Sequence, residues 1–430
     1  MNDQIKKQLK ENRDFYVSHI KNVLLPYWLN RCVDEEYGGY FTAFTPDGKE
    51  LRNTNKYTWS QGRVGWSFSR LAGTKSDIFS EGERAHMLAL AKTGCDFALS
   101  HSVTPEQTCH LVVDRCGVPL EAGPGLGTIG NTFADSFISM SLAAYAETAS
   151  APEMLEKAFT LYKSIEERTE RGAFSVVPNP VPPGFEMLSI YMIMVNLTNE
   201  LHRALSFFGD SRAIEVEKAG KRYCEHVLTH FAQPEGVLLE QVRTDGGPAD
   251  NLLGRYLCPG HSVETMWFTA VSCARRGETQ NEKKALDLLW NTYQLAKDTE
   301  YGGLYYFLDK AGGKPTGQLT YPEDHKMAAL YEQDWTIKLW WSHTETLFGL
   351  LLGYIRTGET KWFDEYQVLH EYIFRTFPNP NLEVGEWLML RDRYGNPIES
   401  AVGAVPLKCP YHTFRNLLMS IELLDQCTES

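Results

Sequence analysis

Histidine 261 is the first residue whose type and spacing could do chemistry. It stands in the stretch "LCPGHSVETMWF" (257–268), where a proline, a glycine and the apolar spacing that follows predict the start of a helix. His261 and Glu264, at i and i+3, would then share one face of its first turn. An imidazole has an unperturbed pKa of about 6.5, so it can accept and donate a proton near neutral pH. A lone histidine there is more often structural, so this pair by itself leaves both interpretations open.

Other apolar segments also begin with polar residues. Arg63 follows "SQG", His343 and Glu345 lie in "WWSHTE", and His412 opens "HTFR". Each buried ionisable group costs desolvation free energy, so a purely structural protein has no need of several such groups at equivalent places. This recurrence favours a functional site and a functional His261.

The elements that must position these residues are two alternating kinds of helix. Amphipathic segments, with apolar residues three and four apart, are expected at 1–20, 81–101, 151–168, 212–231, 281–298 and 360–377. Segments that are apolar nearly all round are expected at 59–73, 132–148, 189–205, 262–276, 343–358 and 413–426. Six shielding helices alternating with six buried ones predict an all-α fold, an (α/α)6 barrel of inner and outer helices. We expect a single catalytic domain over residues 1–430.

A pattern of short β-prone runs and turns repeats about every seventy residues. "EYGGYFTAFTPDGKEL" (36–51) is echoed by "EYGGLYYFLDKAGGKP" (300–315), and looser copies lie at 109–121, 171–183, 234–248 and 384–399. Runs of this kind around Gly, Pro, Asn or Asp predict β-hairpins or extended turns. Because an apolar helix follows each copy, the equivalent ends of the inner helices should meet at one mouth and bring their polar residues together.

The overall composition excludes several classes of function. The chain has 430 residues and a net charge of −13, which argues against nucleic acid or an anionic membrane as partner. No run approaches the ~18 apolar residues of a membrane span, and the charged start is not that of a signal peptide. Nine scattered cysteines fit a reducing compartment. We therefore expect a cytoplasmic protein.

Two sharper motifs lack the context that they need. "GLGTIG" (125–130) matches the dinucleotide pattern GxGxxG, but no strand–turn–helix unit surrounds it, so a loop over the mouth is expected instead. No HExxH or similar spacing was found, and we expect no metal.

Six segments, in order along nearly the whole chain, resemble the N-acylglucosamine 2-epimerase family, a group of (α/α)6 barrels. They are "KYTWSQGRVGW" (56–66), "GRYLCPGHSVETMWF" (254–268), "YGGLYYF" (301–307), "KLWWSHTETL" (338–347), "GEWLML" (385–390) and "KCPYHTFRNL" (408–417). "YMIMVNLTNEL" (191–201) resembles the N-acetylglucosamine 2-epimerase branch, because the cellobiose 2-epimerase and isomerase branches usually place a further histidine near Met192. The animal enzymes have a cysteine where this chain has Pro410, so no role is carried over for that thiol.

The resemblance implies a sugar 2-epimerase that interconverts N-acetyl-D-glucosamine and N-acetyl-D-mannosamine by removing and returning the proton at C2. It makes His261 and His412 the acid–base pair. The residues expected to bind substrate are Arg63, for the developing oxyanion, and Glu264, Trp341, His343, Glu345 and Trp387. Glu264 is expected either to orient His261 or to hold a sugar hydroxyl. No cofactor is required. ATP often modulates the amino-sugar branch, which makes the 125–130 loop a candidate nucleotide site, and a homodimer is expected.

Alternatives remain open at this point. A mannose isomerase or a cellobiose or mannobiose 2-epimerase would keep the chemistry and change the sugar. A glycoside hydrolase would need two carboxylates that flank the scissile bond, and Asp135, Glu264, Glu345 and Glu386 are the available acids. A sugar-binding or renin-binding-like regulatory protein is the third class, against which the intact arginine and histidines argue.

Overall fold

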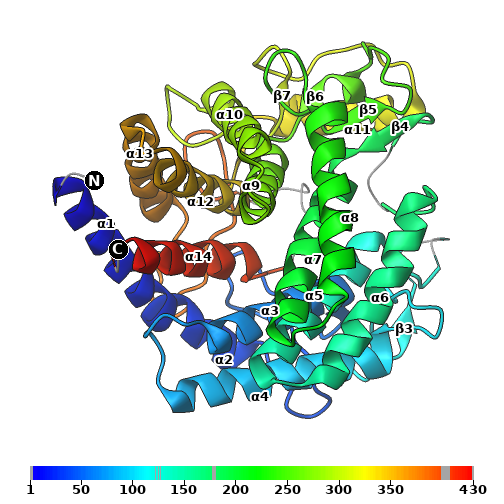
Figure 1. Cartoon of the computed structure of the whole chain (residues 1–430), viewed down its shortest axis with the longest axis vertical. Helices are drawn as coiled ribbons and strands as arrows, with labels where there is room; N and C mark the ends of the chain where they lie inside the picture. Colours follow the sequence, from blue (N-terminus) through cyan, green and yellow to red (C-terminus); the bar gives the residue numbers. More distant parts are fainter. Residues whose placement is uncertain are drawn as a thin grey trace.

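A closed ring of inner helices lies at the centre of the molecule (Figure 1). The computed structural model describes residues 3–121, 123, 125, 127–176, 181–398 and 407–428. The inner helices are α3 (Thr58–Gly73), α5 (Thr132–Ala149), α7 (Leu188–Phe207), α9 (Pro259–Arg275), α12 (Trp340–Thr357) and α14 (Tyr411–Thr428). Each contacts the next, and α14 contacts α3, so the ring closes. The predicted (α/α)6 barrel is confirmed.

An outer layer of helices alternates along the chain with the inner ones. It consists of α1 (Asp3–His19), α4 (Glu81–Phe97), α6 (Pro152–Glu170), α8 (Ala213–His226), α10 (Thr279–Ala296) and α13 (Thr360–Thr376). Burial separates the two kinds as the sequence predicted. The inner helix α5 is buried at every position from Thr132 to Ala146. In contrast, α6 buries only a stripe that includes Leu155, Ala158 and Leu161, three residues apart. Two shorter helices, α2 (Leu25–Arg31) and α11 (Pro322–Asp334), lie outside this alternation.

Short strands lead into several inner helices. They are β1 (Lys56–Tyr57), β2 (Val112–Val113), β3 (Pro119–Leu120), β4 (Phe185–Met187), β5 (Gln241–Arg243), β6 (Tyr256–Leu257), β7 (Leu308–Asp309), β8 (Lys338–Leu339) and β9 (Leu390–Arg391). They pair antiparallel as β1-β2-β3, β4-β5, β6-β7 and β8-β9. Because β1, β4 and β8 end immediately before α3, α7 and α12, these strands mark the end of the barrel at which the inner helices begin. We call this end the mouth.

The pairing of these strands corrects the expectation of local hairpins. Only β2 and β3 lie in one predicted copy, whereas β4 pairs with β5 across a separation of two helices, with Glu186 opposite Val242. Within the copy at 36–51, pairing is reduced to an isolated bridge between Phe44 and Leu51. The turn residues leave too few consecutive extended residues for a local ladder, so the copies pair with the strands that enter inner helices. In the copy at 171–183, residues 177–180 lie outside the described residues.

The echo between 36–51 and 300–315 has a structural basis. Two residues before each copy, a buried aspartate binds a buried lysine that precedes an inner helix and an arginine from a later turn. The two clusters are Asp34 with Lys56 (3.0 Å) and Arg115 (2.9 Å), and Asp298 with Lys338 (2.8 Å) and Arg393 (3.0 Å). Both lysine side chains are fully buried, and a buried charge persists only when it is paired. The clusters therefore fix the turn to the start of α3 in one copy and to the start of α12 in the other.

One apolar core extends through the molecule from Leu9 to Leu424 and includes residues of both helical layers. Among the described residues, no helix combines the length and the apolar character that crossing a bilayer requires.

Candidate active site

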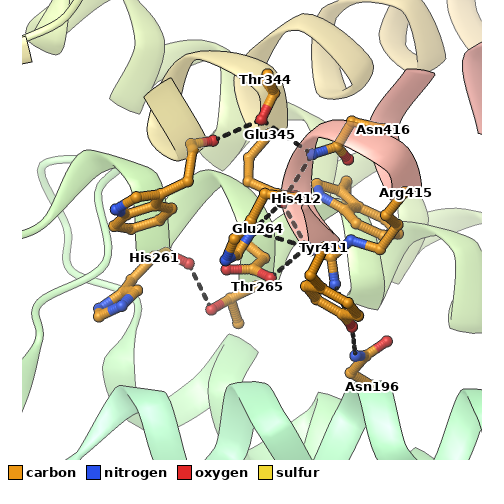
Figure 2. Close-up of polar contacts among 12 residues, drawn as sticks. Asn196, His261, Glu264, Thr265, Thr344, Glu345, Tyr411, His412, Arg415 and Asn416 are labelled. Carbon is orange, nitrogen blue, oxygen red and sulfur yellow. Dashed lines mark hydrogen bonds and ion pairs between the residues drawn. The ribbon is translucent and has the colours of Figure 1, made fainter. Parts of the chain in front are cut away.

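Ionisable side chains from α9, α12 and α14 come together at the mouth. Figure 2 shows His261 and Glu264 from α9, Glu345 from α12, and His412 and Arg415 from α14 in one group. The expected convergence of inner-helix starts thus brings together His261 and His412, the predicted acid–base pair, with Glu264 and Glu345.

His412 is held as a neutral imidazole with one free nitrogen. Its Nδ1 lies 2.6 Å from Glu345 Oε1, and only 5% of the side chain is exposed. A carboxylate only accepts hydrogen bonds, so Nδ1 carries the hydrogen and Nε2 keeps its lone pair. Burial, together with the positive charges of Arg63 and Arg415, lowers the pKa of His412 well below its ordinary value. At neutral pH this residue is therefore ready to accept a proton.

Glu345 is fully buried and orients His412 instead of facing a ligand. Its Oε1 accepts from Asn416 (2.7 Å) and Arg415 (2.5 Å) as well as from His412, and its Oε2 accepts from Trp267 (2.8 Å). Both oxygens are occupied by protein donors, which revises the predicted direct contact between Glu345 and a sugar hydroxyl. Asn416 and Trp267 were not predicted, since each lies inside an apolar run with no partner visible in the sequence.

His261 is paired with a carboxylate that the sequence analysis missed. Its Nδ1 lies 3.0 Å from Oε1 of Glu240, which is buried immediately before β5. Glu264, the predicted partner, lies 2.5 Å from Arg415 instead. Burial alone would lower the pKa of His261, but the charge of Glu240, its hydrogen bond and the charge of Glu264 raise it. The one available signal for Glu240 was a carboxylate inside the apolar run "VLLEQV" (237–242).

The two histidines therefore differ in proton affinity and in access to solvent. The side chain of His261 is 32% exposed, against 5% for His412. Since Nδ1 of His261 donates to Glu240, its Nε2 is the nitrogen that can exchange a proton with a ligand. The pKa of His261 is raised and that of His412 is lowered, so at a given pH His261 binds a proton more readily than His412.

Arg63 provides a positive charge with no carboxylate within ion-pair distance among the described residues. Its guanidinium carbon lies 4.9 Å from the ring centre of Trp59, 4.3 Å from that of Phe137 and 5.1 Å from that of Tyr411. Its buried Nε makes no hydrogen bond to any residue that the structure describes. A guanidinium held between aromatic rings and left without an anion is suited to bind an anionic oxygen.

Trp341 lies beside both imidazoles. The centre of its ring system is 5.2 Å from the ring of His261 and 5.4 Å from that of His412. Gly260 makes this approach possible, because a Cβ there would stand 2.5 Å from the Trp341 ring and 2.5 Å from Ser342 Oγ. The half-buried indole offers a flat apolar face next to the two imidazoles, and its contact with a sugar stays a prediction.

His343 does not belong to this group, which corrects its assignment as a substrate-binding residue. Its Nδ1 donates to the carbonyl of Leu339 (2.6 Å) and its Nε2 accepts from the amide of Leu304 (2.9 Å). Burial lowers its pKa to about 3. At the equivalent place in α3, Gln61 accepts from the amide of Tyr40 (2.7 Å), which lies in the copy at 36–51. His343 therefore secures the turn of its own copy.

Trp387 is also removed from the predicted set. It is fully buried, and its Nε1 donates to Nε2 of His19 at 2.8 Å. With its only polar atom bonded inside the core, it has no surface to offer a ligand. Of the predicted loop at 125–130, residue 126 lies outside the described residues, so the role of that loop stays a prediction.

The mouth already contains a cation where a metal could otherwise bind. Ligand atoms of Glu264, Glu345 and His412 lie within 4.8 Å of one another. Arg415, however, is 2.5 Å from each of the two carboxylates and supplies their counter-charge. A metal ion there would have to displace this buried guanidinium, so these residues do not fit a metal.

Comparison with known proteins agrees with this geometry. Residues 39–415 match the model of a family described as N-acylglucosamine 2-epimerase (GlcNAc 2-epimerase). The chain is 28% identical to an N-acylglucosamine 2-epimerase from Bos taurus over 408 residues, which is 94% of this chain and 89% of the relative. It is 22% identical to a cellobiose 2-epimerase from Ruminococcus albus, over 95% of this chain and 96% of that protein. The solved structure of cellobiose 2-epimerase from Spirochaeta thermophila superposes with a TM-score of 0.77 at 18% identity, covering 99% of this chain and all of the other.

Proposed function

Because the chain belongs to the N-acylglucosamine 2-epimerase family and is thus a carbohydrate epimerase, we propose that it interconverts N-acetyl-D-glucosamine and N-acetyl-D-mannosamine. The observation that carries the proposal is a pair of imidazoles whose pKa values are shifted in opposite directions, both beside Trp341 and both within the field of Arg63. Epimerisation at one carbon needs a base and an acid at the same time, and this pair provides both.

His412 removes the proton in one direction. Its Nε2 lone pair takes the hydrogen from C2 of the open-chain sugar, next to the C1 aldehyde. The imidazolium that forms is stabilised by Glu345, which is hydrogen-bonded to Nδ1 at 2.6 Å. The negative charge moves to the former aldehyde oxygen, where Arg63 has a positive charge that no described carboxylate neutralises. Stabilisation of such an oxyanion by a preorganised donor is worth about 3–4 kcal/mol in other enzymes.

His261 returns a proton to the opposite face of C2. Its Nε2–H is the donor, and Glu240 holds the ring by Nδ1. After one turnover His261 is neutral and His412 is cationic, which is the arrangement that the reverse reaction requires. The two directions therefore use the same residues with exchanged roles.

The amino-sugar substrate is supported by the relatives and by Met192. This residue is buried in α7 at the place where the other branches usually have a histidine, and a thioether cannot transfer a proton. The hydrolase alternative has less support, because its acids are engaged: Asp135 binds Arg168 (2.7 Å) and Glu386 accepts from Trp28 (2.7 Å).

Incubation in D2O tests the reaction and the substrate together. With N-acetylglucosamine, N-acetylmannosamine, mannose and cellobiose as a panel, NMR should show deuterium at C2 and interconversion of the two N-acetylhexosamines only. Release of a reducing end without C2 exchange would support the hydrolase instead. Interconversion of mannose or cellobiose in preference to the amino sugars would overturn the substrate and keep the chemistry.

Glu240→Gln tests the source of the raised pKa of His261. Removing the charge removes the stabilisation of the imidazolium, so the pKa of His261 should fall. Where His261 acts as the acid, the rate declines as pH rises through its pKa, so this alkaline limb should move to lower pH in the variant. The measurement is kcat against pH in both directions. Glu217→Gln is the control, because Glu217, on the outer helix α8, also faces a histidine, His202 at 3.9 Å. An unchanged alkaline limb would show that Glu240 does not set this pKa.

The predicted cytoplasmic location, the homodimer and the modulation by ATP stay predictions. Sedimentation with and without ATP, followed by the same NMR assay, tests the last two.

A further inference from the structure

A second cluster of ligand-type side chains lies on the outside of the barrel. Glu186 stands in β4, His226 ends α8, and His230 lies in the π-helical turn at 227–231 that follows. Figure 1 shows α8 reaching the edge of the barrel at which β4 and β5 pair. One ligand atom from each residue lies within 4.8 Å of the others. We propose that this cluster binds a divalent transition-metal ion of the Zn²⁺ type, at a site separate from the mouth.

The ligand atoms lie close to the spacing of a tetrahedral site, and one of the two measured distances matches it. His226 Nε2 is 2.8 Å from Glu186 Oε2, and His230 Nε2 is 3.4 Å from Glu186 Oε1. Two ligand atoms that each stand about 2.0–2.1 Å from a tetrahedral Zn²⁺ are about 3.3–3.4 Å apart. The spacing "HVLTH" (226–230) places both imidazoles on the same side of the helical turn, with ring centres 4.9 Å apart. Small rotations of the His226 ring and the carboxylate are enough to admit the ion.

One ligand atom of this cluster has no other use in the structure. The buried Nε2 of His230 makes no hydrogen bond to any residue that the structure describes. If the three side chains formed only a hydrogen-bonded cluster, this nitrogen would have a partner, whereas a metal ligand needs an unused lone pair. Tyr191 donates its hydroxyl hydrogen to Glu186 Oε2 at 2.6 Å, which fixes the carboxylate as a supporting hydrogen bond does at other metal sites. Unlike the group at the mouth, no arginine or lysine lies within ion-pair distance of Glu186 among the described residues.

The site would act on the fold, by joining the outer helix to the strand pair. In the β4–β5 ladder Glu186 lies opposite Val242, and the amide of Leu188 donates to the carbonyl of Glu240 (2.8 Å). The bound ion would therefore tie α8 to the strands next to the carboxylate that holds His261. It takes no part in the proton transfers.

The test uses the full chain after treatment with a chelator. We expect one equivalent of Co²⁺ to give the visible absorption of a four-coordinate nitrogen–oxygen site, and Zn²⁺ to displace it. Calorimetry should show His230→Ala and His226→Ala each weakening Zn²⁺ binding by at least about tenfold. Zn²⁺ at a hundredfold excess over Kd should raise the Tm of the wild type by about 3–5 °C and leave that of His226→Ala/His230→Ala unchanged.

His202→Ala is the matched control. His202 also faces a glutamate, Glu217 at 3.9 Å, but no second histidine joins the pair, so its removal should not change Zn²⁺ binding. Circular dichroism of the metal-free variants confirms that they fold. Absence of stoichiometric binding, or equal binding by the folded double variant, would overturn the proposal.

Discussion

His412→Gln is expected to lower the rate of epimerisation by about 10²–10⁴-fold, the usual contribution of a positioned acid–base group. Glutamine can keep a hydrogen bond to Glu345 but cannot take a proton from carbon. His261→Gln should have an effect of the same size, because among the described residues it removes the other imidazole in ring contact with Trp341. The measurement is kcat in both directions by NMR, with the fold checked by circular dichroism.

His343→Gln is the matched control for these two variants. It is the same substitution in another buried histidine of an inner helix. Glutamine should replace this histidine well, because Gln61 accepts an amide hydrogen bond at the equivalent place in α3. We expect its kcat to stay within about twofold of the wild type, since it removes no acid–base group. A large loss of kcat in folded His343→Gln would return this residue to the active site.

Exchange of the C2 hydrogen with solvent separates a two-histidine mechanism from a single shared base. In the proposed mechanism each imidazole acts on one side of C2, so each single variant should still exchange the hydrogen of one epimer and lose exchange of the other. His412→Gln and His261→Gln should retain opposite epimers. Loss of exchange from both epimers in one variant, with none lost in the other, would contradict the assignment of two bases. Wild-type turnover in either variant would remove that residue from the mechanism.

Much of this site could be predicted because the inner helices are recognisable in the sequence as segments that are apolar on all sides. A polar residue in the first turn of such a helix is conspicuous, which is how Arg63, His261 and His412 were found. The pattern could not predict the direction of each side chain. Some side chains in the first turn of an inner helix point into the mouth, and others point towards the neighbouring turn. For this reason the sequence placed His343 in the site, whereas in the structure its buried imidazole secures a turn.

A comparison of the segments that follow the two copies, at 56–63 and 338–345, could have shown the role of His343. "KYTWSQGR" and "KLWWSHTE" align residue by residue, so His343 matches Gln61, and Glu345 matches Arg63 two positions later. Glu240 was beyond such reasoning. It lies 21 residues before His261, and the backbone brings the two segments together where the amide of Glu240 donates to the carbonyl of Tyr256 in β6. Long-range strand pairing of a few residues leaves almost no trace in local sequence.

Arg415→Met is expected to destabilise the protein by about 3–5 kcal/mol, the typical cost of breaking a buried ion pair on one side. Arg415 is 2.5 Å from both Glu264 and Glu345, and all three are buried. Without the guanidinium two carboxylates face each other with no counter-charge. Urea unfolding measures the loss. Arg275→Met is the control, because that arginine pairs with Glu217 at the surface and should cost at most about 1 kcal/mol.

The pH dependence of this loss identifies its cause. In the variant the two carboxylates repel each other, and protonation in acid removes that repulsion. The difference between wild type and Arg415→Met should therefore shrink as pH falls from 7 towards about 4.5. A constant difference would mean that Arg415 stabilises by packing alone, through its contacts with Trp267 and Phe268, and that Glu345 holds His412 without help from a buried cation.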